Sequence, residues 1–426
     1  MRFLYLLAIY LAAPVVSAVF LWRGLRDRSY WRNFGERFGF GARLSPHGVW
    51  LHAVSVGEVQ ACAALVSALR RRYPALPLTV TTFTPTGSTR ARALFGNLAQ
   101  VRYLPYDLPG AVRRFFRRVQ PRLAVIFETE LWPNLYRECG RRRIPLVLAS
   151  ARISARSVSR YQRLGALFRE TLARTALVAA QGAGDAERFR SLGADPANTH
   201  VTGNIKFDFE LPADIAARGA RLRAQYAPDR PLWVAGSTHG GMEEQAVLEA
   251  QRRVREAHPG GLLVLAPRHP PRFDEVAAAL RAAGISFVRR SAADGSVTDA
   301  DCAVLLLDSL GELLDFYAAG DVAFVGGSLA PSGGHNLLEP AALGVPILVG
   351  PNNSNSEEIA RLLIARGAAE VVRDAAELAT RVSALLGDAA ARERMGAAGR
   401  ASVDSNRGAL EKLLALIEPL LEEHSG

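Results

Sequence analysis

The sequence predicts an α/β protein with two Rossmann-like domains facing each other across a cleft, preceded by an N-terminal membrane anchor helix. Three observations support this prediction. A chain of 426 residues is too long for one ordinary hydrophobic core and suits two domains. Short β-prone runs alternate with longer helical patterns, and the alternation restarts halfway along the chain. The first two dozen residues are almost entirely apolar, as in a segment that enters a membrane.

The composition is that of a folded globular chain with excess positive charge. Hydrophobic residues make up 49%, and the net charge of +11 comes almost wholly from arginine, because Lys206 and Lys412 are the only lysines. This charge favours phosphorylated substrates or an acidic membrane surface. We expect no nucleic-acid partner, since no recognised binding motif occurs. Three widely spaced cysteines indicate neither a disulfide framework nor a zinc site, and they suit a reducing cytoplasm.

Residues 1–30 form the predicted anchor. Phe3–Trp22 carries no charge, and its 20 residues match the length that a helix needs to cross a bilayer. More arginines follow this segment than precede it, which favours a cytoplasmic location for the rest of the chain. Two alternatives remain: a cleaved signal peptide, for which the basic cluster lies on the wrong side, and a helix lying in the membrane interface.

Residues 31–210 are predicted to form the first domain. Seven strand-like runs alternate with helical patterns, at 49–54, 78–83, 101–106, 123–128, 145–150, 176–180 and 200–202. Such alternation is typical of a parallel sheet covered by helices. Ligands of these sheets bind at the carboxyl ends of the strands, so the polar residues that follow the strands are the candidate site residues.

Four charged residues of the first domain are candidates. Glu58 opens the helix after the first strand, where it is either a capping acid or a general base, and spacing alone leaves these readings equal. Glu128 and Glu130 follow the fourth strand beside Trp132, and they fit either a sugar site or a solvated strand end. Lys206 closes the domain as an anion-binding or an ordinary surface lysine.

Residues 211–426 are predicted to form the second domain. The strand-like runs recur at 232–235, 262–266, 286–289, 304–307, 322–325, 345–349 and 370–372. The amphipathic helix expected at 409–421 has an apolar face that could pack back onto the first domain. The alternation again predicts a parallel sheet with its ligands at the strand ends.

A glycine-rich loop after the fifth of these strands is the strongest candidate for a nucleotide site. Glycine lets backbone N–H groups approach an anion, and the start of the next helix favours negative charge. The alternative is a simple turn. The residues we assign to the site from this loop are Gly327, Ser328, Gly334, His335, Asn336 and Glu339. Other strand ends add Ser237 and Thr238, then Pro267, Arg268 and His269, then Leu310 and Gly311.

The motifs, taken together, strongly resemble one enzyme family. HAVSVGEV at 52–59, ETELWPN at 128–134, SARIS at 150–154, RHPPRF at 268–273, GGSL at 326–329 and GGHNLLE at 333–339 occur in this order. Each motif alone is weak, but their order resembles the 3-deoxy-D-manno-octulosonic acid (Kdo) transferases of lipopolysaccharide synthesis, glycosyltransferase family 30. The similarity covers nearly the whole chain.

The resemblance implies a GT-B fold and an inverting transfer of Kdo from CMP-Kdo to the lipid A precursor, lipid IVA. It places the chain on the cytoplasmic face of the inner membrane, in contact with membrane lipid, with no cofactor and no essential metal. The first domain would bind the acceptor and the second the CMP-sugar. The rival readings are a glycosyltransferase or epimerase of the same fold with a UDP donor, and a membrane-tethered binding protein without activity.

The resemblance also implies roles for individual residues. Glu58 matches the catalytic base, and Glu128 and Glu130 match an acidic pair whose separate roles stay open. Arg268 and the N–H groups of 333–336 would stabilise the leaving phosphate. Five residues complete the implied donor site: Asn336 and Glu339 at the ribose, Leu310 and Gly311 through their backbone at the cytosine, and Lys206 at the donor's phosphate or carboxylate.

Overall fold

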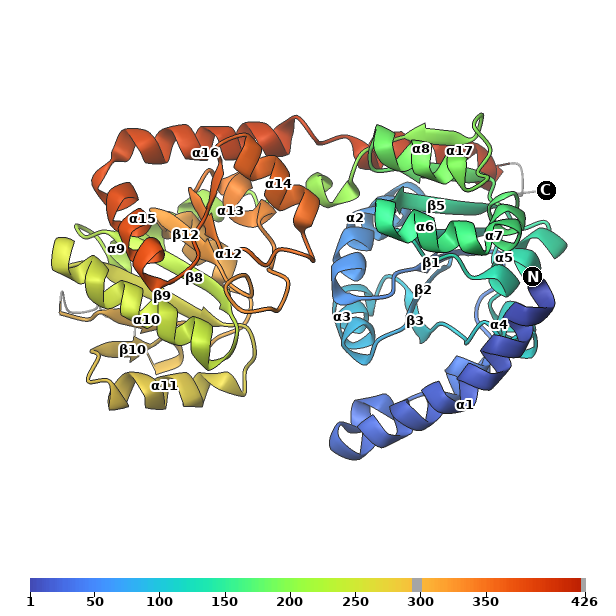
Figure 1. Ribbon diagram of the computed structural model, residues 1–426, viewed down its shortest axis with the longest axis horizontal. Helices are drawn as coiled ribbons and strands as arrows, with labels where there is room; N and C mark the ends of the chain where they lie inside the picture. The colour runs from blue at the N-terminus through green and yellow to red at the C-terminus, as the bar shows by residue number, and fades with distance from the viewer. Residues whose placement is uncertain (293–300, 423–426) are drawn as a thin grey trace. The chain divides into compact units, whose positions relative to one another are not determined.

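The computed structural model describes residues 1–292 and 301–422 of the chain. The chain divides into two compact units, and each is described by itself (Figure 1). Unit 1 contains Met1–Phe209 together with Asn406–Gly426, and unit 2 contains Glu210–Ser405.

Unit 1 is built on a seven-stranded sheet. Every neighbouring pair of strands is parallel, and the order across the sheet is β3-β2-β1-β4-β5-β6-β7. The strands are β1 (Val49–His52), β2 (Leu78–Thr82), β3 (Gln100–Tyr103), β4 (Leu123–Phe127), β5 (Leu146–Ala151), β6 (Leu177–Ala180) and β7 (Thr199–Val201). The strand order reverses between β1 and β4, so a ligand crevice is expected at their carboxyl ends.

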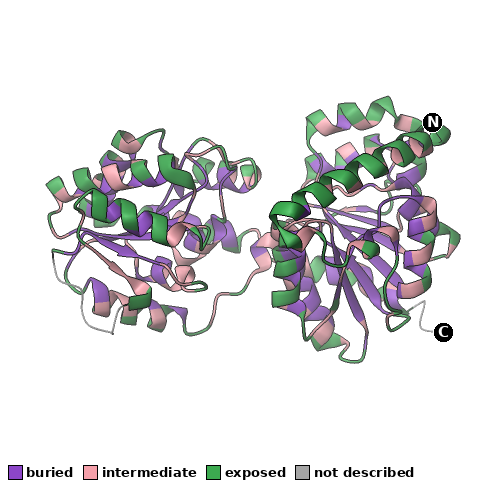
Figure 2. Ribbon diagram, turned by 90° about the horizontal axis from the view of Figure 1, so that it is seen from below, coloured by how far each residue is buried: buried purple, intermediate pink, exposed green. Residues whose placement is uncertain are grey.

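Helices cover both faces of this sheet. They are α2 (Val56–Arg72), α3 (Pro85–Phe95), α4 (Pro109–Val119), α5 (Pro133–Arg141), α6 (Ala155–Arg163), α7 (Gly165–Leu172) and α8 (Ala183–Ser191), with 3₁₀ turns η1 (Arg28–Tyr30), η2 (Phe34–Phe38) and η3 (Ile205–Asp208). Three of the helices begin with proline, whose fixed φ suits a first helical position. The strands between the two edge strands β3 and β7 are buried on both faces, which explains why β4 reads as an unbroken apolar run (Figure 2).

The C-terminal helix α17 (Ala409–Glu422) belongs to unit 1 (Figure 1). Leu413, Leu414, Ile417 and Leu421 enter the same core as α2 and α3. Arg72 on α2 pairs with Glu411 at 2.5 Å and also with Glu418. Asp208 accepts hydrogen bonds from the N–H groups of Gly408 and Leu410, each at 2.6 Å, and so holds the start of α17. The apolar face seen in the sequence therefore completes the first core.

The N-terminal helix α1 (Arg2–Arg26) lies along unit 1 by one face. Ile9, Ala13 and Phe20 pack on a small cluster around Tyr106, and the Tyr5 hydroxyl donates to Asp107 at 2.7 Å. Most of its other side chains are apolar and exposed (Figure 2). Among the described residues, α1 is the one helix long and apolar enough to cross a membrane. The helix thus has an inner face that contacts protein and an outer apolar face.

Unit 2 repeats the architecture with a second seven-stranded parallel sheet. Its strands are β8 (Leu232–Thr238), β9 (Leu262–Pro267), β10 (Phe287–Arg289), β11 (Val304–Leu306), β12 (Val322–Val325), β13 (Ile347–Val349) and β14 (Ala369–Val371). Their order is β10-β11-β9-β8-β12-β13-β14, so the reversal lies between β8 and β12. All fourteen predicted strand-like runs are therefore strands, and the predicted fold class of two parallel-sheet α/β domains is confirmed.

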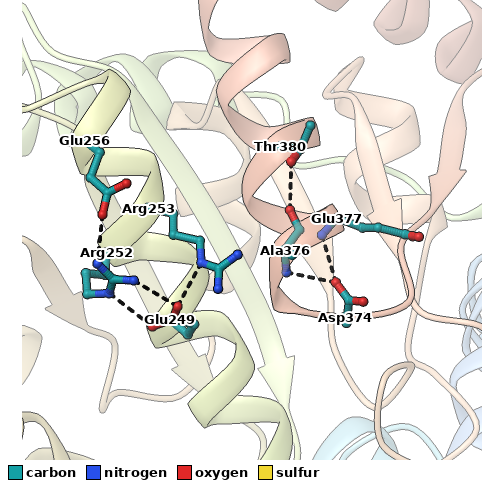
Figure 3. Close-up of polar contacts among 8 residues, drawn as sticks. All are labelled: Glu249, Arg252, Arg253, Glu256, Asp374, Ala376, Glu377 and Thr380. Carbon is teal, nitrogen blue, oxygen red and sulfur yellow. Dashed lines mark hydrogen bonds and ion pairs between the residues drawn. The ribbon is translucent and has the colours of Figure 1, made fainter.

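The helices of unit 2 enclose its sheet. They are α9 (Ile215–Tyr226), α10 (Gly240–Ala257), α11 (Arg272–Ala282), α12 (Leu313–Ala319), α13 (Leu338–Leu343), α14 (Glu357–Ala365), α15 (Ala375–Gly387) and α16 (Ala389–Asp404), with the 3₁₀ turn η4 (Arg290–Ala292). Helices α10 and α15 share one core. On the surface of α10, Glu249 pairs with Arg252 and Arg253, and Asp374 caps the start of α15 (Figure 3). These exposed contacts stabilise the two helices.

Candidate functional site

The reversal point of unit 1 holds Glu58, in the first turn of α2. One carboxylate oxygen accepts the Val54 N–H at 2.8 Å and the other accepts the Ser55 hydroxyl at 3.1 Å. Glu58 therefore does cap the helix start, as one of the two sequence readings proposed. A carboxylate that caps a helix still has lone pairs with which it can accept a proton. The geometry is therefore also compatible with a general base at Glu58.

The pKa of Glu58 is raised to about 8. Burial is the main cause, because it disfavours the charged form, and the negative charge of Glu128 adds to it. The charge of Glu130 acts in the same direction, while the hydrogen bonds from Val54 and Ser55 oppose the shift. A carboxyl group with this pKa accepts a proton well near neutral pH.

Glu128 and Glu130 stand at the end of β4, next to β1. Lys206 places its Nζ 2.7 Å from Glu128 Oε1, and Glu128 itself has a left-handed backbone with φ of 58°. Such a φ is uncommon for a residue with a side chain, and strained residues of this kind cluster at functional sites. Glu130 accepts the Trp132 indole N–H at 2.9 Å, and burial raises the pKa of its carboxyl.

The four charged residues that the sequence selected in the first domain are thus brought together. Glu58, Glu128 and Glu130 come from the two strand ends that flank the reversal, and Lys206 comes from η3. Lys206 contacts a carboxylate of its own domain in this structure, whereas its predicted contact with the donor stays a prediction. These four residues can take up a proton at Glu58, and Lys206 supplies a positive charge beside the carboxylate of Glu128.

In unit 2, the buried carboxylate of Glu243 organises the reversal point. Glu243, in the first turn of α10, is 1% exposed. It accepts five backbone N–H groups within 3.3 Å, those of His239, Gly327, Ser328, Leu329 and Ala330. Four consecutive N–H groups of the loop after β12 therefore converge on an internal anion, an arrangement known as a nest.

Sequence reasoning did not select Glu243. The sequence nevertheless contains a signal that identifies Glu243, because Glu58 and Glu243 occupy equivalent positions in the two domains. Each lies in the first turn of the helix after the first strand, and each accepts the N–H four residues earlier, from Val54 and His239 respectively. In unit 2 the carboxylate is turned inward, so Gly327 and Ser328 have their N–H groups bonded to Glu243.

Three histidines meet beside this loop. His239 stacks on His335 with ring centroids 4.9 Å apart and contacts His269 edge-on at 5.0 Å. They come from the ends of β8 and β9 and from the loop after β12. The pKa of His335 is lowered to about 4, mainly by burial and in addition by the neighbouring His239 and the charge of Arg268. The predicted residues Arg268, His269 and His335 therefore belong to one cluster.

The remaining candidates in unit 2 have distinct positions. Thr238 is buried and its hydroxyl has no hydrogen-bond partner among the described residues. Asn336 accepts the Leu338 N–H at 3.0 Å, just before α13, a helix of only six residues. Further candidates lie near these: Ser237 and Pro267 at the ends of β8 and β9, Gly334 donating its N–H to Gly327 O, and Glu339 in the first turn of α13. Leu310 and Gly311 lie in an exposed turn before α12.

The chain is similar in sequence to known enzymes over 99% of its length. The family model described as 3-deoxy-D-manno-octulosonic-acid transferase (kdotransferase) matches residues 32–209. The 3-deoxy-D-manno-octulosonic acid transferase of Haemophilus influenzae is 41% identical over 427 residues, which cover 99% of each chain. The chain belongs to the Kdo transferase family.

One further comparison bears on the family and another on the fold. The family member from Bordetella pertussis is 40% identical over 437 residues, again covering 99% of each chain. The UDP-GlcNAc 2-epimerase of Neisseria meningitidis, solved with UDP-GlcNAc bound, is only 14% identical, yet it matches with a TM-score of 0.57 over 87% of this chain and all of that one. The epimerase shares the two-domain fold, and the family resemblance inferred from the motifs is confirmed.

Proposed function

We propose that the chain transfers Kdo from CMP-Kdo to lipid IVA, with inversion at the ketosidic carbon and with Glu58 as the general base. The observation that carries the proposal is the partly buried Glu58 carboxyl, whose pKa is raised to about 8 at the reversal point of a family member. A base with this pKa is matched to neutral pH, where it can accept a proton from a sugar hydroxyl.

The proposed reaction needs one proton acceptor and one site for a leaving phosphate. The acceptor hydroxyl oxygen attacks the ketosidic carbon of Kdo and its proton passes to Glu58. The bond from that carbon to the phosphate oxygen breaks, and CMP departs with the bonding electrons. Arg268, at the end of β9, is suited to stabilise the growing charge of the phosphate, because guanidinium groups bind phosphate oxygens in a fixed geometry.

The proposed donor site also includes the ends of β8 and β12. Asn336 and Glu339 would hold the ribose, and the backbone at Leu310 and Gly311 would contact the cytosine. The loop that Glu243 fixes would set the position of these groups relative to Arg268. The proposal needs neither a metal ion nor another cofactor, because CMP is itself a competent leaving group.

We also propose that α1 attaches the enzyme to the cytoplasmic face of the inner membrane. The outer side chains Leu4, Leu11 and Val15 are 60%, 66% and 63% exposed and apolar. Their burial in lipid would be favourable, and the arginines that follow α1 suit anionic headgroups. The inner face of α1 contacts the rest of unit 1. A helix that lies along the membrane interface therefore fits this packing better than one that crosses the membrane fully.

Transfer from CMP-Kdo to lipid IVA by the purified full-length protein tests the reaction, with the product detected by mass spectrometry. Glu58→Gln keeps the shape of the side chain and removes its basicity, so it should lose transfer by at least about 100-fold while still binding CMP. Glu170→Gln removes an exposed carboxylate on α7 and serves as the matched control. No product from the wild type would refute the reaction, and an active Glu58→Gln variant would refute the base.

Flotation with vesicles tests the attachment. The double variant Leu7→Glu, Leu11→Glu places charge on the outer face of α1, and it should remain in the soluble fraction when mixed with anionic lipid vesicles. Flotation equal to that of the wild type would contradict the proposed membrane face.

A further inference from the structure

His239, His269 and His335 form a cluster that no step of the proposed reaction uses. The three rings come from three loops that the fold brings together, after β8, β9 and β12. His239 lies at the centre: its ring is nearly parallel to that of His335, at 15°, and nearly perpendicular to that of His269, at 87°. Three imidazoles in contact are a concentrated set of groups that can gain protons near neutral pH.

Two ring nitrogens of this cluster lack a hydrogen bond to any of the residues that the structure describes. The Nε2 atoms of His239 and His335 are buried and have no hydrogen-bond partner among the described residues. Buried polar atoms in native proteins are nearly always bonded, and one explanation for an exception is a ligand that supplies the missing partner. Two such atoms on adjacent stacked rings point to a single ligand with several acceptor oxygens.

The charges around the cluster determine when it can hold a proton. Arg268, from the loop after β9, acts on all three rings and disfavours their protonation. Glu243, from α10, acts on His239 in the opposite direction, but its carboxylate already accepts five backbone N–H groups. Burial also lowers the pKa of His239 and His269. Without a bound anion the cluster is therefore neutral at physiological pH, and Arg268 is its adjacent cation.

We infer that this histidine cluster is a proton-loading phosphate site, which takes up a proton from solvent when a phosphate monoester dianion binds beside Arg268. The inference rests on the proposed function, because it assigns the dianion to the phosphate of CMP. In CMP-Kdo the phosphate is a diester with one negative charge, and in released CMP it is a monoester that carries two above its second pKa, near 6. The cluster gains its proton as the leaving group gains this second charge.

The protons balance in this scheme. The proton of the acceptor hydroxyl goes to Glu58 and then to solvent. The proton on the cluster comes from solvent and returns to solvent when CMP leaves. The cluster therefore favours the product charge state over that of the donor, which is the direction that assists departure of the phosphate.

Titration calorimetry of the full-length protein with CMP measures this uptake directly. The apparent binding enthalpy is recorded at pH 7.5 in buffers that differ in ionisation enthalpy, and the slope gives the number of protons taken up. We expect between about 0.5 and 1 proton per CMP, and a Kd that weakens up to about tenfold per pH unit between pH 7 and 8. The methyl ester of CMP, which keeps a single negative charge, should take up markedly less.

Variants assign the proton to the cluster. His335→Gln and His239→Gln should each reduce the uptake strongly while CMP still binds. His258→Gln is the matched control, because His258 lies elsewhere in unit 2 and bonds to Ser383 O. Glu58→Gln should keep the uptake, since it removes the proposed general base, whose pKa is raised to about 8, without touching the histidines.

Each outcome bears on the inference. CMP binding with no proton uptake, or with uptake unchanged in both histidine variants, would overturn the inference and leave the proposed function standing. Uptake lost in Glu58→Gln alone would place the proton in the other domain and would also overturn it. A protein that binds no CMP at all would overturn both the proposed function and the inference that rests on it.

Discussion

The acid limb of the pH–rate profile should move in opposite directions when the two neighbours of Glu58 are changed. A pKa of about 8 leaves about one tenth of Glu58 ionised at pH 7, so the rate of transfer should rise with pH and level off above pH 8. Glu128→Gln removes a charge that raises the pKa of Glu58, and its limb should shift to lower pH. Lys206→Met removes the cation 2.7 Å from Glu128 Oε1 and should shift the limb to higher pH.

The size of these shifts follows from Coulomb's law. Two unit charges several ångströms apart interact by about 2–4 kcal/mol at an effective dielectric constant near 20, and one pKa unit is worth about 1.4 kcal/mol. Because Lys206 cancels part of the field of Glu128, each substitution should move the limb by on the order of one pH unit. The position of the limb does not depend on the absolute rate, so weaker substrate binding in either variant leaves the test intact.

The assay is kcat/KM for Kdo transfer between pH 6 and 9.5, which reports on ionisations of the free enzyme. Glu170→Gln, which changes an exposed ion pair on α7, should leave the limb in place. Limbs that coincide in the wild type and both variants, or that shift in the same direction in both, would refute the electrostatic account of Glu58.

The same pKa links Glu58 to stability. Between the ordinary glutamate pKa, near 4.3, and about 8, the folded protein holds a proton at Glu58 that the unfolded chain has lost. Stability therefore falls as pH rises through this window, by an upper limit on the order of 4–5 kcal/mol. Glu58→Gln should remove this loss, so its Tm should exceed that of the wild type at pH 8 and match it near pH 4. A lower Tm at pH 8 would contradict the burial of an unfavourable charge.

Three further predictions test parts of unit 2 and the first core. Glu243→Gln replaces one of the two carboxylate oxygens that order the loop after β12, so KM for the donor should rise at least about tenfold and the free energy of unfolding should fall by about 2–4 kcal/mol. Glu249→Gln, at an exposed carboxylate of the same helix, should leave KM unchanged. Gly350→Ala places a Cβ 2.2 Å from the Ser328 backbone and should abolish stable folding of unit 2 in thermal scans, whereas Gly241→Ala, with open space around it, should be nearly neutral. Ile417→Ala on α17, where the side chain is fully buried, should cost about 2–5 kcal/mol in urea unfolding; a loss below 1 kcal/mol would show that α17 is not part of the first core.

The strands were predictable because their pattern is local. A strand buried on both faces must be apolar throughout, and the helices between the strands carry the longer period, so all fourteen runs can be read from neighbouring residues. The position of Glu58 was equally readable, since it follows a strand and opens a helix. Its two proposed roles were not separable from spacing, because capping and proton acceptance both place a carboxylate at a helix start.

The other parts of the site depend on contacts between distant segments. Glu243 and the Gly327–Ala330 loop are more than 80 residues apart, and nothing in either segment reports that five N–H groups meet one carboxylate. The glycines suggested a phosphate-binding loop, but the structure shows that four of its N–H groups serve an internal anion. A backbone nest looks the same in sequence whether its anion is a ligand or a side chain.

The sequence by itself determined the repeated α/β architecture, the apolar N-terminal helix and the family, because these follow from short-range periodicity and from the order of motifs. Only the tertiary structure decided which strand ends lie side by side, with β1 next to β4 and β8 next to β12. That adjacency brings the charge of Glu128 close enough to add to the effect of burial on the pKa of Glu58, and it stacks His239 on His335. Burial and the electric field at a site are sums over neighbours in space, and the chain specifies those neighbours only once it has folded.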